Sequence, residues 1–157
     1  MSAWIELLRW AHVVGATVLL GTGAGIAFFM LTAHRTAQPA IIAHVAETVV
    51  VADTVFTATA IVVQPITGVL LAQAIGWPLT TPWIIVSLMI YVATGLCWLP
   101  VVWIQWRIRN LARASAAAGT PLPASYHQLF RIWVLLGIPA FAFVLAIVWL
   151  MVTRPSL

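Results

Sequence analysis

Residues 129–152 read LFRIWVLLGIPAFAFVLAIVWLMV, and Arg131 is the only charged residue in this run. A helix crosses the hydrocarbon core of a bilayer with about 20 apolar residues, so the run predicts a membrane-spanning helix. Three further runs of sufficient length precede it, at residues 5–33, 49–74 and 82–104. We therefore expect an all-α fold, a polytopic membrane four-helix bundle with antiparallel helices.

The composition indicates that lipid is the main solvent of this chain. Hydrophobic residues make up 64% of it, charged residues 6%, and the mean hydropathy is +1.10. Soluble domains carry about 25% charged residues, so three acids and seven bases are too few for a polar shell. A net charge of +4 would suggest a nucleic-acid partner in a soluble protein, but here the bases are arginines spread over helix ends. We expect the lipid bilayer as a partner and no nucleic acid.

Proline and glycine residues mark the connections between the runs, at residues 38–39, 76–82 and 119–123. Residues 40–48 and 107–118 are compatible with helix but less apolar, so they are expected to extend two helices beyond the membrane. The first run is too long for the h-region of a signal peptide and is expected to remain in the mature protein. The chain is thus interpreted as a single transmembrane domain, 1–157, with helices at about 5–33, 40–74, 82–116 and 124–152.

The arginines indicate the orientation of the bundle. Positively charged residues favour cytoplasmic connections, and most arginines flank the first and third connections rather than the opposite side. We expect a multi-pass protein of the bacterial inner membrane with both termini outside the cytoplasm. The arginines near the first and third connections are Arg35, Arg107, Arg109, Arg113 and Arg131, and those on the opposite side are Arg9 and Arg154.

Three polar residues, Glu6, Arg9 and His12, recur at intervals of three in the first helix. This spacing places them along one side of it. Ionisable groups inside a membrane are costly and mark candidate functional sites. We interpret His12 as a ligand of the iron of a b-type haem, with Arg9 near a propionate. The alternative is a buried histidine bonded to a neighbouring helix, with Arg9 extending to the membrane surface.

The same helix is rich in glycine, and Gly21 and Gly25 form a GxxxG pair. Such pairs allow two membrane helices to approach closely. This pattern favours a helix contact, and a homodimer is expected. The alternative is a flat surface against which a porphyrin lies.

The second helix carries a polar site at Gln64 and Pro65. Gln64 and His12 are each roughly 8–10 residues from the same end of the bundle, so they are expected at about the same depth. Pro65 removes a backbone donor and frees a carbonyl near Ile61. A polar kink beside a histidine suits the distal side of a haem or a quinone carbonyl. The alternative is a kink with an interhelical amide bond.

Asp53, earlier in the same helix, is interpreted as a structural carboxylate paired with Thr22 or Thr54, and the alternative is a proton relay. Trp98 lies deeper than the tryptophans at the expected membrane interfaces and needs another role. The single cysteine, Cys97, is expected to pack. Common hydrolase and nucleotide-binding motifs are absent from the sequence.

Three other histidines, His34, His44 and His127, belong to helix ends on the expected cytoplasmic side. Antiparallel helices can bring them together, and imidazoles bind transition metals or a second haem. Their spacing matches no known metal motif. The alternative is that they are solvated or face lipid.

The segment LLRWAHVVGATVLLGTGAGIAFFMLTAHR at 7–35, with those at 48–72, 76–105 and 119–151, resembles a bacterial family of small integral membrane proteins of unknown function. The resemblance covers nearly the whole chain and implies a four-helix membrane fold.

The chain is more remotely similar to the membrane protoporphyrinogen oxidases that bind haem b, and to related copper-resistance membrane proteins. The first helix of the oxidases carries a basic residue three positions before a haem-ligating histidine, as Arg9 and His12 do here. Those oxidases also use a lysine near the start of the third helix, whereas residues 77–86 contain Trp83 and no lysine. The similarity implies haem binding but does not carry over porphyrinogen oxidation. The methionine and histidine clusters favoured by copper are also absent from the sequence.

Together these features lead to three functional hypotheses. The first is a b-type haem protein in electron transfer or oxidation linked to the quinone pool. The second is a membrane scaffold without enzymatic activity, associating through the GxxxG face. The third is a transporter of a metal ion or small solute with Asp53, Gln64 and His12 along the path.

Overall fold

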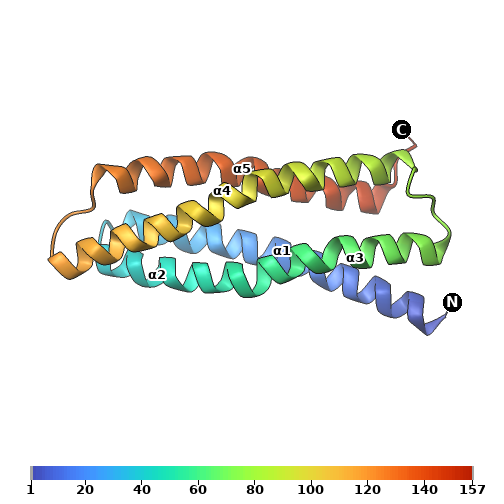
Figure 1. The fold of residues 1–157 in the computed structure, drawn as a ribbon, viewed down its shortest axis with the longest axis horizontal. Helices are drawn as coiled ribbons and strands as arrows, with labels where there is room; N and C mark the ends of the chain where they lie inside the picture. Colours follow the sequence, from blue (N-terminus) through green and yellow to red (C-terminus); the bar gives the residue numbers. More distant parts are fainter. Residues whose placement is uncertain (1, 157) are drawn as a thin grey trace.

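Four long helical segments run antiparallel along a common axis in the computed structural model, which describes residues 2–156 (Figure 1). No strand occurs in this part of the chain, so the predicted all-α four-helix fold is confirmed. The helical ranges expected from the sequence all lie within the observed helices. These are α1 (Ala3–Arg35), α2 (Pro39–Ala52), the π-helix η1 (Asp53–Thr57), α3 (Ala58–Ile75), α4 (Pro82–Ala118) and α5 (Ala124–Thr153).

Proline and glycine set several helix ends. Pro39 and Pro82 occupy the first turns of α2 and α4, where a missing N–H costs nothing and the fixed φ suits a helix. Gly76 and Gly119 end α3 and α4 with φ values of 87° and 63°, a left-handed conformation that glycine adopts without strain. The sharp turns that follow reverse the chain direction.

The two ends of the bundle differ in which segments they contain. Both chain termini and the connection between α3 and α4 lie at one end, here called the termini end (Figure 1). The connections between α1 and α2 and between α4 and α5 lie at the other, called the arginine-rich end. The helices α2, η1 and α3 are continuous from Pro39 to Ile75 and act as one span.

The helices also pair differently at the two ends. α4 packs along α5 and crosses to α2 at the arginine-rich end (Figure 1). α1 packs against α3 toward the termini end and against α2 toward the other. α1 and α3 therefore form the pair that positions the candidate site.

Apolar burial is concentrated at the arginine-rich end. Side chains of α1, α2, α4 and α5 form one cluster there, with Ile42, Ile108 and Tyr126 each 0% exposed. At the termini end the buried set includes the polar residues Gln64, Thr67 and Ser87. The ends thus differ in their interior: one is a packed core, and the other buries hydrogen-bonding side chains.

The outer surface of the bundle is apolar. Val152 is 75% exposed and Leu135 is 69% exposed. Four helical stretches are long and apolar enough to cross a membrane: Ala3–Arg35, Pro39–Ile75, Pro82–Ala118 and Ala124–Thr153. A surface of this kind is stable in lipid but not in water. The fold is that of an integral membrane protein with four spans.

An ion-pair network joins α2 to α4 near the arginine-rich end. Glu47 Oε2 lies 2.5 Å from Arg113 Nη2 and 3.7 Å from Arg109 Nε. The Arg109 guanidinium also lies over the Trp106 ring, 4.5 Å from its centroid. These contacts anchor the extension of α4 beyond the apolar core.

Pro65 interrupts the backbone bonding of α3 as predicted. It lacks the N–H that the carbonyl of Ile61 would accept in a regular helix. The hydroxyl of Tyr91 on α4 donates a hydrogen bond to that carbonyl instead. The prediction of a freed carbonyl at Ile61 is confirmed, and its partner comes from the neighbouring pair of helices.

Candidate functional site

The His12 side chain points from α1 to α3, where it meets Thr67. Its Nδ1 lies 3.0 Å from Thr67 Oγ1. The Thr67 hydroxyl also lies 2.8 Å from the carbonyl oxygen of Val63 and 3.2 Å from that of Gln64. A hydroxyl has one hydrogen to donate, and these carbonyls can only accept it. Thr67 Oγ1 therefore accepts from His12 Nδ1–H, which leaves the lone pair of the imidazole on Nε2.

Gln64 ties the backbone of α1 to α3 at the same level. Its side chain is 7% exposed, and Nε2 donates to the carbonyl oxygen of His12 over 2.8 Å. The structure thus brings Gln64 and His12 together, as their common depth suggested. The amide makes an interhelical bond, which is one of the two interpretations left open by the sequence.

Two glycines make room for these contacts. A Cβ on Gly15 would lie 2.5 Å from Gln64 Nε2, and a Cβ on Gly68 would lie 3.0 Å from His12 Cε1. Gly15 on α1 therefore accommodates the Gln64 amide, and Gly68 on α3 accommodates the imidazole ring. Each of the two helices therefore carries one polar side chain and one glycine, and each glycine lies against the polar side chain of the other helix.

Thr67 and Gly68 were not identified from the sequence as site residues. They follow Gln64 by three and four positions, which places all three on one side of α3. This spacing could have identified them from the sequence, because a helix that packs against Gln64 also packs against the residues three and four positions later on the same side.

Arg9 lies one helical turn from His12 toward the termini end. Its side chain is exposed, as is that of Glu6. The guanidinium is therefore at the surface of the bundle, one turn nearer the helix end than the imidazole.

The glycine pair Gly21 and Gly25 does not lie beside His12. Gly21 follows His12 by nine residues, about half a turn around the helix at 3.6 residues per turn. Apart from the adjacent backbone of α1 itself, no atom of residues 2–156 lies within 4 Å of a Cβ built on Gly21 or Gly25. The glycines therefore form an open surface on the other side of α1 from the imidazole.

The three histidines near the arginine-rich end do not converge on one point. His34 Nδ1 lies 3.0 Å from the Tyr126 hydroxyl, and its ring stacks on Phe130 with centroids 3.8 Å apart. The rings of His34 and His127 lie 5.9 Å apart, whereas His44 is exposed on α2. No group of three or more histidine, cysteine or acidic side chains in residues 2–156 is arranged to hold a metal ion.

His34 is also too far from His12 to complete a site with it. The two residues are separated by 22 positions of one helix, which is about 33 Å at 1.5 Å per residue. Any site at His34 and His127 is therefore separate from the one at His12.

Asp53 pairs differently from the sequence expectation. Thr54, one predicted partner, donates its hydroxyl to the carbonyl of Val50. The Asp53 Oδ1 accepts a hydrogen bond from Trp98 Nε1 of α4 over 3.3 Å. This hydrogen bond explains why Trp98 lies deeper than the tryptophans at the membrane interfaces.

The four apolar spans and the polar contacts between them define a small polytopic integral membrane protein. A family model described as "Predicted integral membrane protein (DUF2269)" matches residues 6–155. The chain belongs to this family, which agrees with the expected small membrane family of unknown function. No curated protein matches the chain, and no solved structure does.

Proposed function

We propose that this membrane protein binds one b-type haem through His12 Nε2 and carries electrons to or from the quinone pool. The observation that carries the proposal is the bond between His12 Nδ1 and Thr67 Oγ1. Histidine ligands of metals almost always donate their other ring N–H to an acceptor, which fixes the tautomer and the ring orientation. His12 has this arrangement inside a membrane span.

The surrounding residues fit one axial ligand and its support. Thr67 orients the imidazole, Gly68 leaves space for the ring, and Gln64 holds the α1 backbone at His12 against α3. Arg9, one turn nearer the helix end, supplies a cation at the level where an anionic propionate would approach the interface. When bound, a b-type haem supplies one-electron redox chemistry. Residues at the arginine-rich end are not needed for this site.

The test is an optical spectrum of the detergent-purified protein, oxidised and then reduced with dithionite, with a pyridine haemochrome assay of haem per chain. Wild type should show a Soret band, reducible α and β bands, and one haem per chain. His12→Ala should lose the haem. His44→Ala is the matched control, because His44 is exposed on α2 and should be dispensable. Full haem occupancy in His12→Ala would refute the assignment.

A second candidate function is that of a scaffold, in which two copies associate through the face containing Gly21 and Gly25. The observation that favours it is the open space at both glycines, with no described atom within 4 Å of either Cβ position. Association of membrane helices depends on close backbone approach, which a GxxxG pair allows. A second copy of α1 would complete the packing that the single chain leaves open.

Gly21→Leu is expected to convert dimers to monomers without unfolding the chain. Leucine would block close approach, its Cβ enters open space, and it is a better helix former than glycine. The measurement is the oligomeric state in detergent by light scattering or chemical crosslinking. Gly137→Leu is the control, since Gly137 is equally open but lies on α5 outside the glycine pair. If Gly21→Leu remains dimeric, or wild type is monomeric, this face is not the contact.

A further inference from the structure

Asp53 is a buried carboxyl group within the membrane-spanning part of the bundle. It is 4% exposed and begins the π-helix η1 in the continuous span Pro39–Ile75. The apolar run of this span begins at residue 49, so at 1.5 Å per residue Asp53 lies about 6 Å inside it and about 32 Å from residue 74. The other two acids of the sequence, Glu6 and Glu47, lie nearer to helix ends. Carboxyl groups at such depth are costly and are retained at sites of ion or proton binding.

One oxygen of this carboxyl group has a partner and the other does not. Oδ1 accepts from Trp98 Nε1, whereas Oδ2 has no hydrogen-bond partner among residues 2–156. The hydroxyl of Thr57, four residues along η1 and 8% exposed, is a neighbour of this carboxyl group but makes no well-aligned hydrogen bond among these residues. Buried polar atoms without partners are rare and need an explanation. Here two such atoms occur on one short segment of helix.

The backbone at this place is also unusual. Residues Asp53–Thr57 form a π-helix, and the N–H of Ala58 donates to the carbonyl of Asp53. π-helical turns inside α-helices are uncommon and occur frequently at functional sites. The sequence contains neither proline nor glycine within this segment that would require the irregularity. The irregular turn coincides with the unpartnered oxygens.

The number of available oxygens identifies the ligand class. Calcium takes six to eight oxygen ligands and magnesium six in a near-octahedral arrangement. Among the side chains of residues 2–156 this site offers two oxygens without hydrogen-bond partners, Asp53 Oδ2 and Thr57 Oγ1, and the indole N–H of Trp98 already occupies Oδ1. A proton needs only one oxygen to bind to and one neighbouring group to hydrogen-bond with it. A threonine hydroxyl can donate to a carboxylate or accept from a carboxylic acid, so it suits both states.

The helices around Asp53 carry few other titratable groups at this level. Residues 13–33 of α1, 54–75 of η1 and α3, and 132–153 of α5 contain none. On α4 the nearest are Tyr91, whose hydroxyl donates to the carbonyl of Ile61, and Cys97. The nearest charged groups on α2 and α4 are Glu47 and Arg107, toward the arginine-rich end, and His44 lies beyond Glu47. The ion pairs found among residues 2–156 involve Glu47 and not Asp53.

We propose that Asp53 is a proton-binding site in the membrane-spanning part of the bundle, toward its arginine-rich end, which takes up and releases a proton at Oδ2 with the Thr57 hydroxyl as its neighbour. The proton comes from and returns to water, and no other bond changes. Trp98 holds the second oxygen in either state. This site is 11 residues of helix from Gln64 and 14 from Thr67, so it does not depend on haem at His12.

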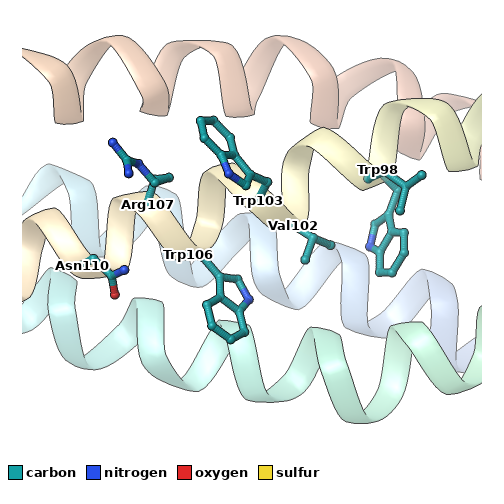
Figure 2. Close-up of a pocket in the computed structure, with 7 residues that line it drawn as sticks. Trp98, Val102, Trp103, Trp106, Arg107 and Asn110 are labelled. Atoms are coloured by element: carbon teal, nitrogen blue, oxygen red, sulfur yellow. The ribbon is translucent and has the colours of Figure 1, made fainter.

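Trp98 also connects the site to the membrane-facing surface (Figure 2). It lines a groove of about 450 Å³ on α4, together with Leu99, Val102, Trp103, Trp106, Arg107 and Asn110. Figure 2 shows Trp98 at one end of this groove and Asn110 with Arg107 toward the other. The lining is mostly apolar, so a lipid-soluble reagent can approach the Trp98 indole, whose Nε1 donates to Asp53 Oδ1.

The test uses two carbodiimides on the full-length protein in detergent. Dicyclohexylcarbodiimide is lipid-soluble and adds to a protonated carboxyl group, which then rearranges to a stable N-acylurea that mass spectrometry locates. Asp53 should be labelled at acidic pH, and the labelling should be lost as the pH becomes alkaline. A water-soluble carbodiimide should label the exposed Glu6 and not Asp53. Asp53→Asn should remove the adduct from this segment, whereas Glu47→Gln should retain it.

Trp98→Phe provides a second readout that does not remove the carboxyl group. Without the indole N–H the carboxylate form is less stable, so labelling should persist to more alkaline pH than in wild type. His12→Ala should show the wild-type labelling profile, which separates this proposal from the haem proposal. The proposal is overturned if dicyclohexylcarbodiimide leaves Asp53 unmodified across the pH range. It is also overturned if labelling is independent of pH or unchanged in Trp98→Phe.

Discussion

Gly15→Leu should separate α1 from α3 and destabilise the bundle more than any other glycine substitution on α1. A Cβ at this position would lie 2.5 Å from Gln64 Nε2 and 3.3 Å from its Cδ. The Gln64 side chain would have to move, which breaks its bond to the His12 carbonyl, and the rest of the leucine would enter the helix contact. Overpacking costs roughly 1–3 kcal/mol and the lost interhelical bond about 0.6 kcal/mol, so we expect about 2–4 kcal/mol in total.

The measurement is unfolding in mixed micelles with increasing dodecyl sulfate, followed by circular dichroism. Gly21→Leu is the matched control on the same helix, since a Cβ at Gly21 meets open space. The stability of Gly15→Ala should fall between those of wild type and Gly15→Leu. The Gln64 amide is the end of a flexible side chain and can move away from a methyl group. Equal stability of Gly15→Leu and Gly21→Leu would show that the α1–α3 contact does not depend on Gly15.

The overall fold was predictable because the bilayer imposes a length on each helix. Runs such as 129–152 are too long and too apolar to belong to a soluble domain. Pro39, Pro82, Gly76 and Gly119 then indicated where helices begin or end, since each acts through its own backbone restriction. These are local properties of the chain and need no knowledge of how the helices pack.

The partners of the polar side chains were only partly predictable. The depth of Gln64 and His12 follows from counting residues, and so does the carbonyl freed by Pro65. Depth does not give the direction of a side chain around its helix. For that reason Tyr91 as the donor to Ile61, and Trp98 as the donor to Asp53, were found only in the structure.

The histidines near the arginine-rich end illustrate the same limit. His34 and His127 lie within one aromatic cluster, whereas His44 is exposed. Ile42, Ala43 and Ala46 occupy the core-facing side of α2, and His44 falls on the other side. The π-helix η1 was not predicted either, because a change of helical register inside an apolar run depends on the helices that contact it.

Thr67→Val should weaken haem binding about 10–100-fold, the range seen when the outer partner of a histidine ligand is removed. Valine has nearly the shape of threonine, so the α1–α3 contact is kept while His12 Nδ1 loses its acceptor. The imidazole can then rotate or place its hydrogen on Nε2, and both changes remove the lone pair from the position where it binds iron. The measurement is a haem titration of the protein purified without haem, followed at the Soret band.

Thr59→Val is the control on the same helix, because the Thr59 hydroxyl is exposed and donates to the carbonyl of Val55 in its own helix. Thr67→Ser keeps a hydroxyl and should bind haem nearly as wild type does. If Thr67→Val and Thr59→Val bind haem equally well, the bond from His12 to Thr67 serves only the contact between helices. In that case the free lone pair on Nε2 no longer argues for iron, and the scaffold function becomes the better account of the residues between α1 and α3.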